Sequence, residues 1–153
     1  MGKIEAINIT SKSSDNTIYI NQAFLEKNKG IVNDRYYNNY KSKKEQVTLI
    51  NLEEINNFNE TIGKIIDPKD FRRNIIVSGI KLSELINKKI LINDVVLKIH
   101  EICQPCVYLQ NKLKIPKLVK LLVNKSGVRA EILSSGFISI NDKIITPKYQ
   151  KNF

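Results

Sequence analysis

The 153 residues fit one domain, expected to span residues 1–153, and suffice to bury a core without disulfides or a metal. An apolar content of 42% and a charged content of 26% exclude a disordered chain, and no apolar run reaches the roughly 18 residues of a membrane helix. The net charge of +10 comes mainly from lysines scattered along the whole chain. Such scatter argues against nucleic-acid binding and indicates a basic surface that attracts anionic ligands.

Short β-branched and alternating runs predict strands through most of the chain. Residues 3–12 alternate apolar and polar positions, with a change of face between Ala6 and Ile7. A turn is predicted at residues 13–16 and a long loop at residues 26–45. The other predicted strands are residues 17–20, 46–51, 72–78, 90–92, 95–102, 128–133, 137–140 and 144–145.

Helices are predicted only as short connections. They are expected at residues 52–59, 81–86, after Gln104 and at about 116–123. The pattern predicts a mostly β protein, a β-barrel with a few helical insertions rather than a doubly wound α/β sheet. Tight turns with asparagine in the left-handed conformation are predicted at Asn33-Asp34, Asn93-Asp94 and Asn141-Asp142.

The sharpest chemical feature is the sequence Cys103-Gln104-Pro105-Cys106, where a strand ends and Pro105 suits the first position of a helix. Free N–H groups and the helix dipole favour a thiolate there. Three other interpretations remain open. The cysteines could form a redox pair, although the chain lacks the βαβ context that such a pair needs, or a zinc site with His100, although a fourth ligand is lacking. They could also be a buried, inert pair. His100 is otherwise interpreted as structural. With no secretory signal, we expect a cytoplasmic protein with reduced thiols.

Arginine is rare in this chain, with four arginines against 21 lysines, so its positions are informative. The guanidinium group offers phosphate or carboxylate a planar fork that lysine cannot copy. Arg72, Arg73 and Asn74 at the start of a predicted strand are therefore expected to bind an anion, the alternative being a solvated strand end with an ion pair. In a regular strand only one of the two arginines would face the site.

Five blocks, in this order along the chain, resemble the MOSC domain, which is the C-terminal domain of the molybdenum cofactor sulfurases and also occurs alone in small bacterial proteins. The blocks are GIVNDRYY at 30–37, QVTLI at 46–50, FRRNIIVSGIKLSEL at 71–85, ILINDVVLKIHEICQPCVYL at 90–109 and GVRAEILSSGFISINDKI at 127–144. The family has glycine where this chain has Asn33, Asn93 and Asn141, and asparagine tolerates the same backbone geometry. The resemblance implies a barrel-like, mostly β fold.

The resemblance also implies a cysteine that carries sulfur or ligates molybdenum in a pterin cofactor. The family cysteine follows a proline, which matches Cys106, and Cys103 is expected to be a helper or resolving thiol. Ligand-binding positions of the family match Arg72, Arg73, Asn74, Asp34 and Arg35, with Thr48 as an orienting group. The expected function is molybdenum-cofactor binding or sulfur carriage, with an anionic pterin or a sulfur donor as partner.

Two alternatives accompany this expectation. One is a non-catalytic module that delivers cofactor or sulfur to a partner enzyme, and the other is a molybdenum-dependent reductase of N-hydroxylated compounds, as in some relatives. The chain lacks the aminotransferase-like domain of the full sulfurases, so we expect neither pyridoxal phosphate nor cysteine desulfuration. It also lacks the N-terminal β-barrel domain of the amidoxime-reducing relatives. Whether the protein is an enzyme stays open at this point.

Overall fold

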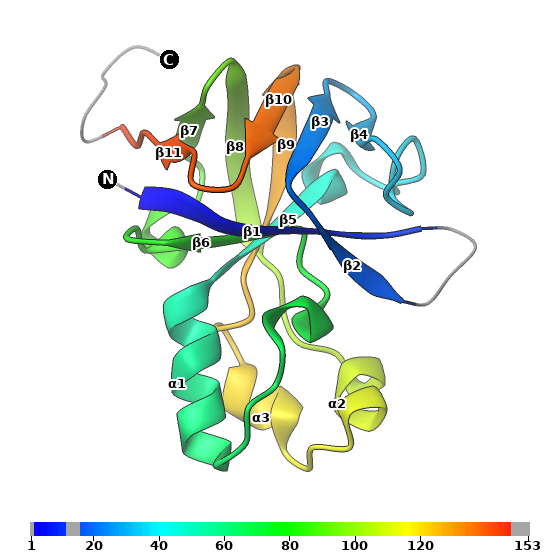
Figure 1. The fold of residues 1–153 in the computed structure, drawn as a ribbon, viewed down its shortest axis with the longest axis vertical. Coiled ribbons are helices and arrows are strands. Elements are labelled where there is room, and N and C mark those ends of the chain that lie inside the picture. The colour runs from blue at the N-terminus through cyan, green and yellow to red at the C-terminus, as the bar shows by residue number, and fades with distance from the viewer. Residues whose placement is uncertain (1, 12–15, 148–153) are drawn as a thin grey trace.

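The computed structural model describes residues 2–11 and 16–147, and strands dominate it (Figure 1). The predicted turn at residues 13–16 and the last residue of the strand predicted at 3–12 lie largely outside the described residues. The strands are β1 (Gly2–Thr10), β2 (Thr17–Ile20), β3 (Gln22–Glu26), β4 (Gly30–Ile31), β5 (Val47–Asn51), β6 (Ile75–Ser78), β7 (Lys89–Ile92), β8 (Val95–Ile102), β9 (Val128–Ser134), β10 (Gly136–Ser139) and β11 (Lys143–Ile144). The helices are α1 (Leu52–Ile62), α2 (Val107–Leu113) and α3 (Leu118–Leu122).

The main sheet curls so far that its two edges meet. Its strand order is β11-β1-β6-β5-β9-β8-β7, with β2 beside β1, and a smaller sheet has the order β10-β3-β4. Leu91 on β7 and Ile145, just after β11, exchange backbone hydrogen bonds of 2.9 and 2.8 Å. This bridge joins the edges of the sheet. The predicted barrel-like, mostly β fold is confirmed.

The strands pair antiparallel except for β5 and β6, which run parallel and are joined through α1. A parallel pair needs such a crossover because its strands start at the same edge of the sheet. The cysteine sequence lies between β8 and α2, outside this βαβ unit. In β1, a bulge between Ile4 and Ala6 shifts the alternation by one, so Ile4, Ile7 and Ile9 all face the interior of the barrel while Ala6 packs on its outer side. The change of face therefore lies before Ala6, whereas the sequence predicted it after Ala6.

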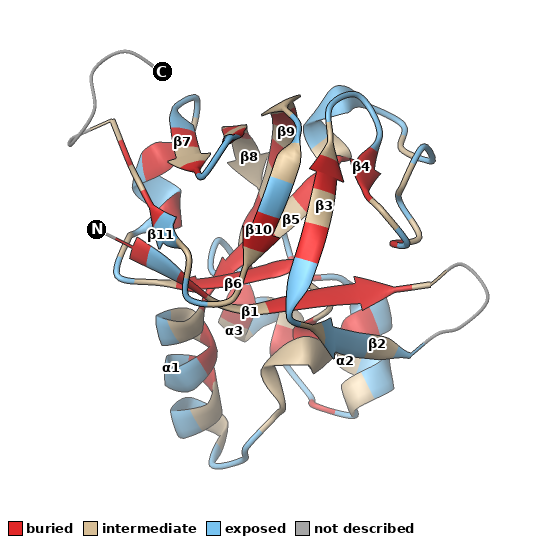
Figure 2. Ribbon diagram, turned by 45° about the horizontal axis from the view of Figure 1, so that its top comes forward, coloured by how far each residue is buried: buried red, intermediate tan, exposed pale blue. Residues whose placement is uncertain are grey.

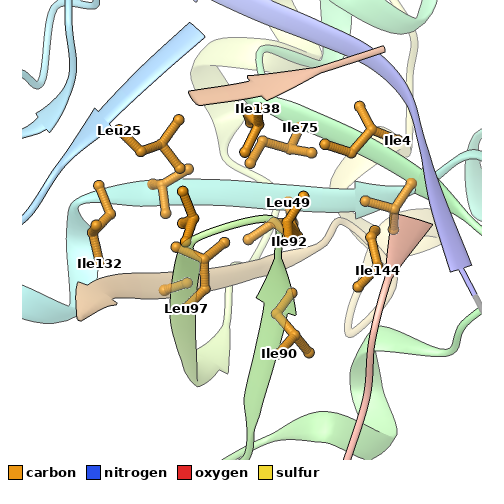
Figure 3. Packing of buried hydrophobic residues seen from close by; sticks show 14 of the residues in the cluster. Ile4, Leu25, Leu49, Ile75, Ile90, Ile92, Leu97, Ile132, Ile138 and Ile144 are labelled. Carbon is orange, nitrogen blue, oxygen red and sulfur yellow. The ribbon is translucent and has the colours of Figure 1, made fainter. Parts of the chain in front are cut away.

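Two hydrophobic clusters lie on opposite sides of the sheet. The interior of the barrel is filled by a large cluster that includes Ile4, Leu49 and Leu97 (Figure 3). The second cluster lies between the outer face of the sheet and the helices, and the next residue of β5, Ile50, belongs to it together with Phe58. Figure 2 shows the result on α1, which has one buried face and one exposed face. Consecutive residues of one strand thus support two cores.

The helices are short because local signals end them quickly. Glu53 and Glu54 in the first turn of α1 suit the helix dipole, and Gly63 ends the helix in the left-handed conformation with φ of 66°. Helix α2 begins at Val107, later than predicted, because Cys106 is extended and takes the N-cap position. Pro105 therefore precedes the helix. Among the residues that the structure describes, no helix has the length and apolar character to cross a bilayer.

Two other predictions of local structure were wrong. Strand β6 begins at Ile75 rather than at residue 72, because Arg72 ends a 3-10 turn at Pro68–Phe71 with φ of 60°. Strands β3 and β4 lie where no strand was predicted, and β4 interrupts the loop predicted at residues 26–45. The three predicted asparagine turns are confirmed, because Asn33, Asn93 and Asn141 have φ values of 75°, 53° and 73°.

Candidate functional site

A pocket of about 720 Å³ brings distant parts of the chain together. The loop after β4, the start of β5, the segment before β6 and the loop between β8 and α2 all contribute to its wall. The four arginines of the chain, Arg35, Arg72, Arg73 and Arg129, all line this pocket, and so do both cysteines. The pocket therefore combines concentrated positive charge with two thiols.

The irregular backbone before β6 explains why both neighbouring arginines reach the pocket. The expectation that only one of them would face the site assumed a regular strand from residue 72. Arg72 instead has a left-handed backbone, and strand geometry begins only at Ile75. The strict alternation of side chains does not apply to Arg72 and Arg73.

Aromatic rings lie against two of the arginines. The guanidinium carbon of Arg35 is 4.7 Å from the ring centroid of Tyr36, and that of Arg72 is 5.4 Å from the ring centroid of Tyr108. At these distances the face of the ring attracts the cation. The amine of Lys112 lies 5.9 Å from the same Tyr108 ring. The rings restrict the directions in which the guanidinium groups can turn.

The guanidinium of Arg73 contacts the loop that precedes β9. Its Nε donates to the Ser126 carbonyl at 2.7 Å, and Nη2 approaches the Ser126 hydroxyl at 3.3 Å. Arg129 on β9 pairs with Glu101 on β8, with 3.7 Å between nitrogen and oxygen. The four arginines of the pocket are thus not equivalent.

The two cysteines differ in exposure. Cys106 is exposed at the N-cap of α2, whereas only 4% of Cys103 is accessible. Both are free thiols. The side chain of Gln104 between them exchanges hydrogen bonds with Asn124, donating to its Oδ1 at 2.6 Å and accepting from its backbone N–H at 2.8 Å. Reagents in solution reach Cys106 more readily than Cys103.

Thr48 lines the pocket, but Asn74 lies behind it and is buried. The Asn74 side-chain oxygen accepts from the backbone N–H of Thr48 at 3.0 Å and from its hydroxyl at 3.1 Å. The Thr48 hydroxyl in turn accepts from the backbone N–H of Asn74 at 3.0 Å. Asn74 therefore joins the start of β6 to β5 and orients Thr48.

Asp34 is buried as well and does not line the pocket. Its carboxylate accepts from the backbone N–H groups of Thr10 at 3.0 Å and Tyr36 at 3.3 Å, which ties the loop after β4 to the end of β1. Burial raises the pKa of Asp34, although these hydrogen bonds and nearby Arg35 act in the opposite direction. Asp34 and Asn74 both border a recess of about 10 Å³ beside the two neighbouring arginines.

His100 takes part in a structural pair. Its Nε2 lies 2.9 Å from Oε1 of Glu131 on the neighbouring strand β9, and both side chains are mostly buried. Within residues 2–11 and 16–147, no group of three or more histidine, cysteine, aspartate or glutamate side chains could hold a metal ion. The described residues therefore give no support to a zinc site that includes His100.

A family model described as the MOSC domain matches residues 36–145, which is most of the chain. The chain belongs to the MOSC domain family. The match includes every predicted site residue except Asp34 and Arg35. MOSC domains are associated with binding of the molybdenum cofactor.

Solved structures support the same fold. The YUAD protein from Bacillus subtilis superposes with a TM-score of 0.80 at 21% identity, covering 94% of each chain. YiiM from Geobacillus stearothermophilus has a TM-score of 0.74 at 16% identity, covering 95% of this chain and 75% of the other. YiiM from Escherichia coli gives 0.71 at 13% identity, over 94% and 69% of the two chains. No curated protein matched the sequence.

The residues of the MOSC pocket fit a phosphate-bearing cofactor whose metal accepts sulfur ligands. Guanidinium groups match the geometry of phosphate oxygens, and a cysteine thiolate is a soft ligand. The pocket wall carries guanidinium groups at Arg72 and Arg35 and the exposed thiol of Cys106. Thr48 adds a hydroxyl to the same wall.

Other pocket residues were missed by the sequence analysis. They include Arg129, Tyr36, Tyr40, Lys41 and Tyr108. The rarity of arginine applied equally to Arg129, so that signal was present in the sequence. The tyrosines had no comparable signal, because their place in the pocket depends on how the loop after β4 and helix α2 approach each other.

Proposed function

We propose that this MOSC protein binds a molybdenum pterin cofactor in the pocket, with the Cys106 thiolate as the protein ligand to the metal. The observation that carries the proposal is that one pocket holds an exposed thiol together with every arginine of the chain. When bound, such a cofactor supplies a redox-active metal for oxygen or sulfur transfer. The residues of this chain bind and orient it.

Each wall of the pocket has a separate task in this proposal. Arg72, held against Tyr108, and Arg35, held against Tyr36, bind the phosphate oxygens. Since the Thr48 hydroxyl donates its proton to Asn74, it offers a ligand only an acceptor oxygen. Asp34 and Asn74 support this arrangement from behind, because they fix the loop after β4 and the start of β6.

The exposure of Cys106 also favours a second function, which is sulfur carriage. In that reaction the Cys106 thiolate attacks the terminal sulfur of a donor persulfide. The donor S–S bond breaks, a new S–S bond forms on Cys106, and the donor leaves as a thiol, so no external oxidant is required. A protein of this kind hands its sulfur to a partner enzyme and needs no bound metal.

Elemental analysis separates the two functions. The protein is expressed in cells that make the cofactor, and molybdenum is measured per chain after purification, with the mass of the intact protein as a second reading. We expect molybdenum in the wild type, its loss in Cys106→Ser, and less of it in Arg72→Lys, because lysine cannot form the bidentate contact. Lys64→Ala, which removes an exposed charge outside the pocket, is the matched control and keeps the metal.

The result can refute either function. Full molybdenum retention by Cys106→Ser shows that this thiol is not the ligand. A wild type without molybdenum but with an extra sulfur on Cys106 supports sulfur carriage. A wild type with neither molybdenum nor added sulfur contradicts both.

A further inference from the structure

The cysteine loop leaves the sheet beside another loop. Strand β8 ends at Ile102 opposite Val128, where β9 begins, so the segments next to these two residues run side by side (Figure 1). The backbone N–H of Cys103 donates to the carbonyl of Gly127 at 2.8 Å and extends the pairing by one residue. Beyond that point the carbonyl groups of the cysteine loop need partners outside the sheet.

The guanidinium of Arg73 supplies those partners. Its Nη2 approaches the carbonyl oxygens of Cys103 at 3.5 Å and Gln104 at 3.4 Å, while Nε donates to the Ser126 carbonyl. The Ser126 hydroxyl also donates to the Cys103 carbonyl at 2.5 Å. One planar cation thus contacts both loops, which a lysine ammonium at the same place could not match.

The backbone that carries Arg73 is itself fixed. The Asn8 side chain on β1 donates to the Arg73 carbonyl at 2.9 Å, and the Asn8 backbone N–H donates to the Asn74 carbonyl at 2.7 Å. The next residue, Asn74, is bound to Thr48 on β5 through its side chain. The guanidinium therefore projects from a rigid part of the barrel toward the cysteine loop.

We propose that Arg73 is a positioning residue for the cysteine loop and not part of the anion-binding wall. It holds the main chain at Cys103 and Gln104, so that Cys103 stays buried while Cys106 stays open to the pocket. The inference concerns the pocket of the proposed function, but it requires no molybdenum, so the two can fail separately. Arg72 keeps the anion-binding role.

Labelling with iodoacetamide tests the proposal on the whole chain, with the rate at each cysteine measured by mass spectrometry. In the wild type we expect Cys106 to react and Cys103 to be protected. In Arg73→Lys the rate at Cys103 should rise by about tenfold or more, because several charge-assisted hydrogen bonds are lost. Ser126→Ala removes part of the same network and should raise that rate by about threefold. Arg72→Lys, at the neighbouring position, should leave Cys103 protected.

A general loss of stability is distinguished by a control elsewhere in the barrel. Ile90→Val mildly destabilises the interior core and does not touch the loop, so it should not expose Cys103. The proposal is overturned if Cys103 stays protected in Arg73→Lys, or if Ile90→Val exposes it equally. Should Arg73→Lys fail to fold, Ser126→Ala decides, and an unchanged rate at Cys103 in that variant overturns the proposal. Molybdenum content does not enter this test.

Discussion

At many turns of this protein, asparagine takes the left-handed backbone conformation that glycine takes in other proteins. Among the described residues, the asparagines with positive φ are Asn28, Asn33, Asn38, Asn87, Asn93, Asn124 and Asn141. Asparagine tolerates the left-handed region better than other residues that carry a Cβ. The asparagine-rich composition therefore has a structural use in the turns.

Asn141 gives a direct test of this use. It is exposed, with φ of 73°, in the turn before β11. We expect Asn141→Gly to leave the free energy of unfolding unchanged or slightly higher, and Asn141→Val to lower it by about 1–2 kcal/mol, because a β-branched residue is strained there. Urea denaturation measures both. Equal stability of the two variants would contradict the expectation.

Asn93 should respond differently, which makes it a useful comparison. Its side chain donates to Asp142 at 2.7 Å and to the Phe137 carbonyl at 3.3 Å. Asn93→Gly relieves the backbone strain of the left-handed conformation but also removes these hydrogen bonds. We therefore expect it not to raise the free energy of unfolding.

The buried carboxyl of Asp34 predicts a pH dependence of stability. Because burial raises its pKa above the ordinary value of 3.8, the folded protein holds this proton more tightly than the unfolded chain. The stabilisation that this tighter proton binding provides is complete at pH values below the ordinary pKa of 3.8. It is lost as the pH rises through the raised pKa of Asp34 in the folded protein. We expect the unfolding free energy of the wild type, measured relative to Asp34→Asn, to fall from about pH 4 upward. Urea unfolding of both proteins across that range measures it, and a rising difference would refute the sign.

Individual site residues could be predicted where their type was rare or chemically distinctive. Cys106 and Arg72 stood out by type and by spacing, and both line the pocket. Asp34 and Asn74 border a recess beside the pocket arginines, and the sequence could not show that they lie behind the wall. That distinction depends on burial, which is decided by the packing of β1, β5 and β6 rather than by local pattern.

At the scale of elements, the loop entering β9 depends on one glycine. Gly127 has φ of +100°, and a Cβ placed on it would lie 2.1 Å from the Leu49 carbonyl oxygen. We expect Gly127→Ala to lower the unfolding free energy by more than about 2 kcal/mol, since strain and backbone overlap add. Thermal or urea unfolding measures the loss.

The control for this variant is Gly63→Ala at the end of α1. Gly63 also has positive φ, but no atom lies within 4 Å of its added Cβ, so only the strain of about 1 kcal/mol applies. If both variants lost the same stability, the close approach to Leu49 would have no effect. Since Gly127 adjoins Ser126, the same substitution should also loosen the cysteine loop.

Elements with a complete alternating pattern were predictable, and those defined by their partners were not. Strand β8 was predicted with its observed bounds, because Val95, Leu97 and Ile99 share one buried face. In strand β3 only Ala23 and Leu25 are buried, and it is a strand because it pairs with β10 and β4. The late start of α2 at Val107 likewise follows from the extended backbone of Cys106.

At the scale of the whole molecule, the bridge between Leu91 and Ile145 joins the two edges of the main sheet in the part of the chain that the structure describes. The backbone N–H of Ile145 donates to the Leu91 carbonyl at 2.8 Å, and proline has no N–H. We expect Ile145→Pro to lower the unfolding free energy by about 1–3 kcal/mol and to speed amide hydrogen exchange at Leu91. Ile145→Val keeps the N–H and is the control. Unchanged exchange at Leu91 in Ile145→Pro would show that the bridge does not hold the edges together.

The position of β1 in the sheet has a consequence for how this protein is made. Residues 2–10 leave the ribosome before all of their partners, which are β2, β6 and finally β11 at residues 143–144. Part of β1 can pair with β2 early in synthesis, but its groups that pair with β6 stay unpaired until residues 75–78 are translated, and those of Gly2 and Lys3 until β11 is translated. The barrel can close only after β11 has been translated, and until then the free edge of β1 is open to pairing with other chains.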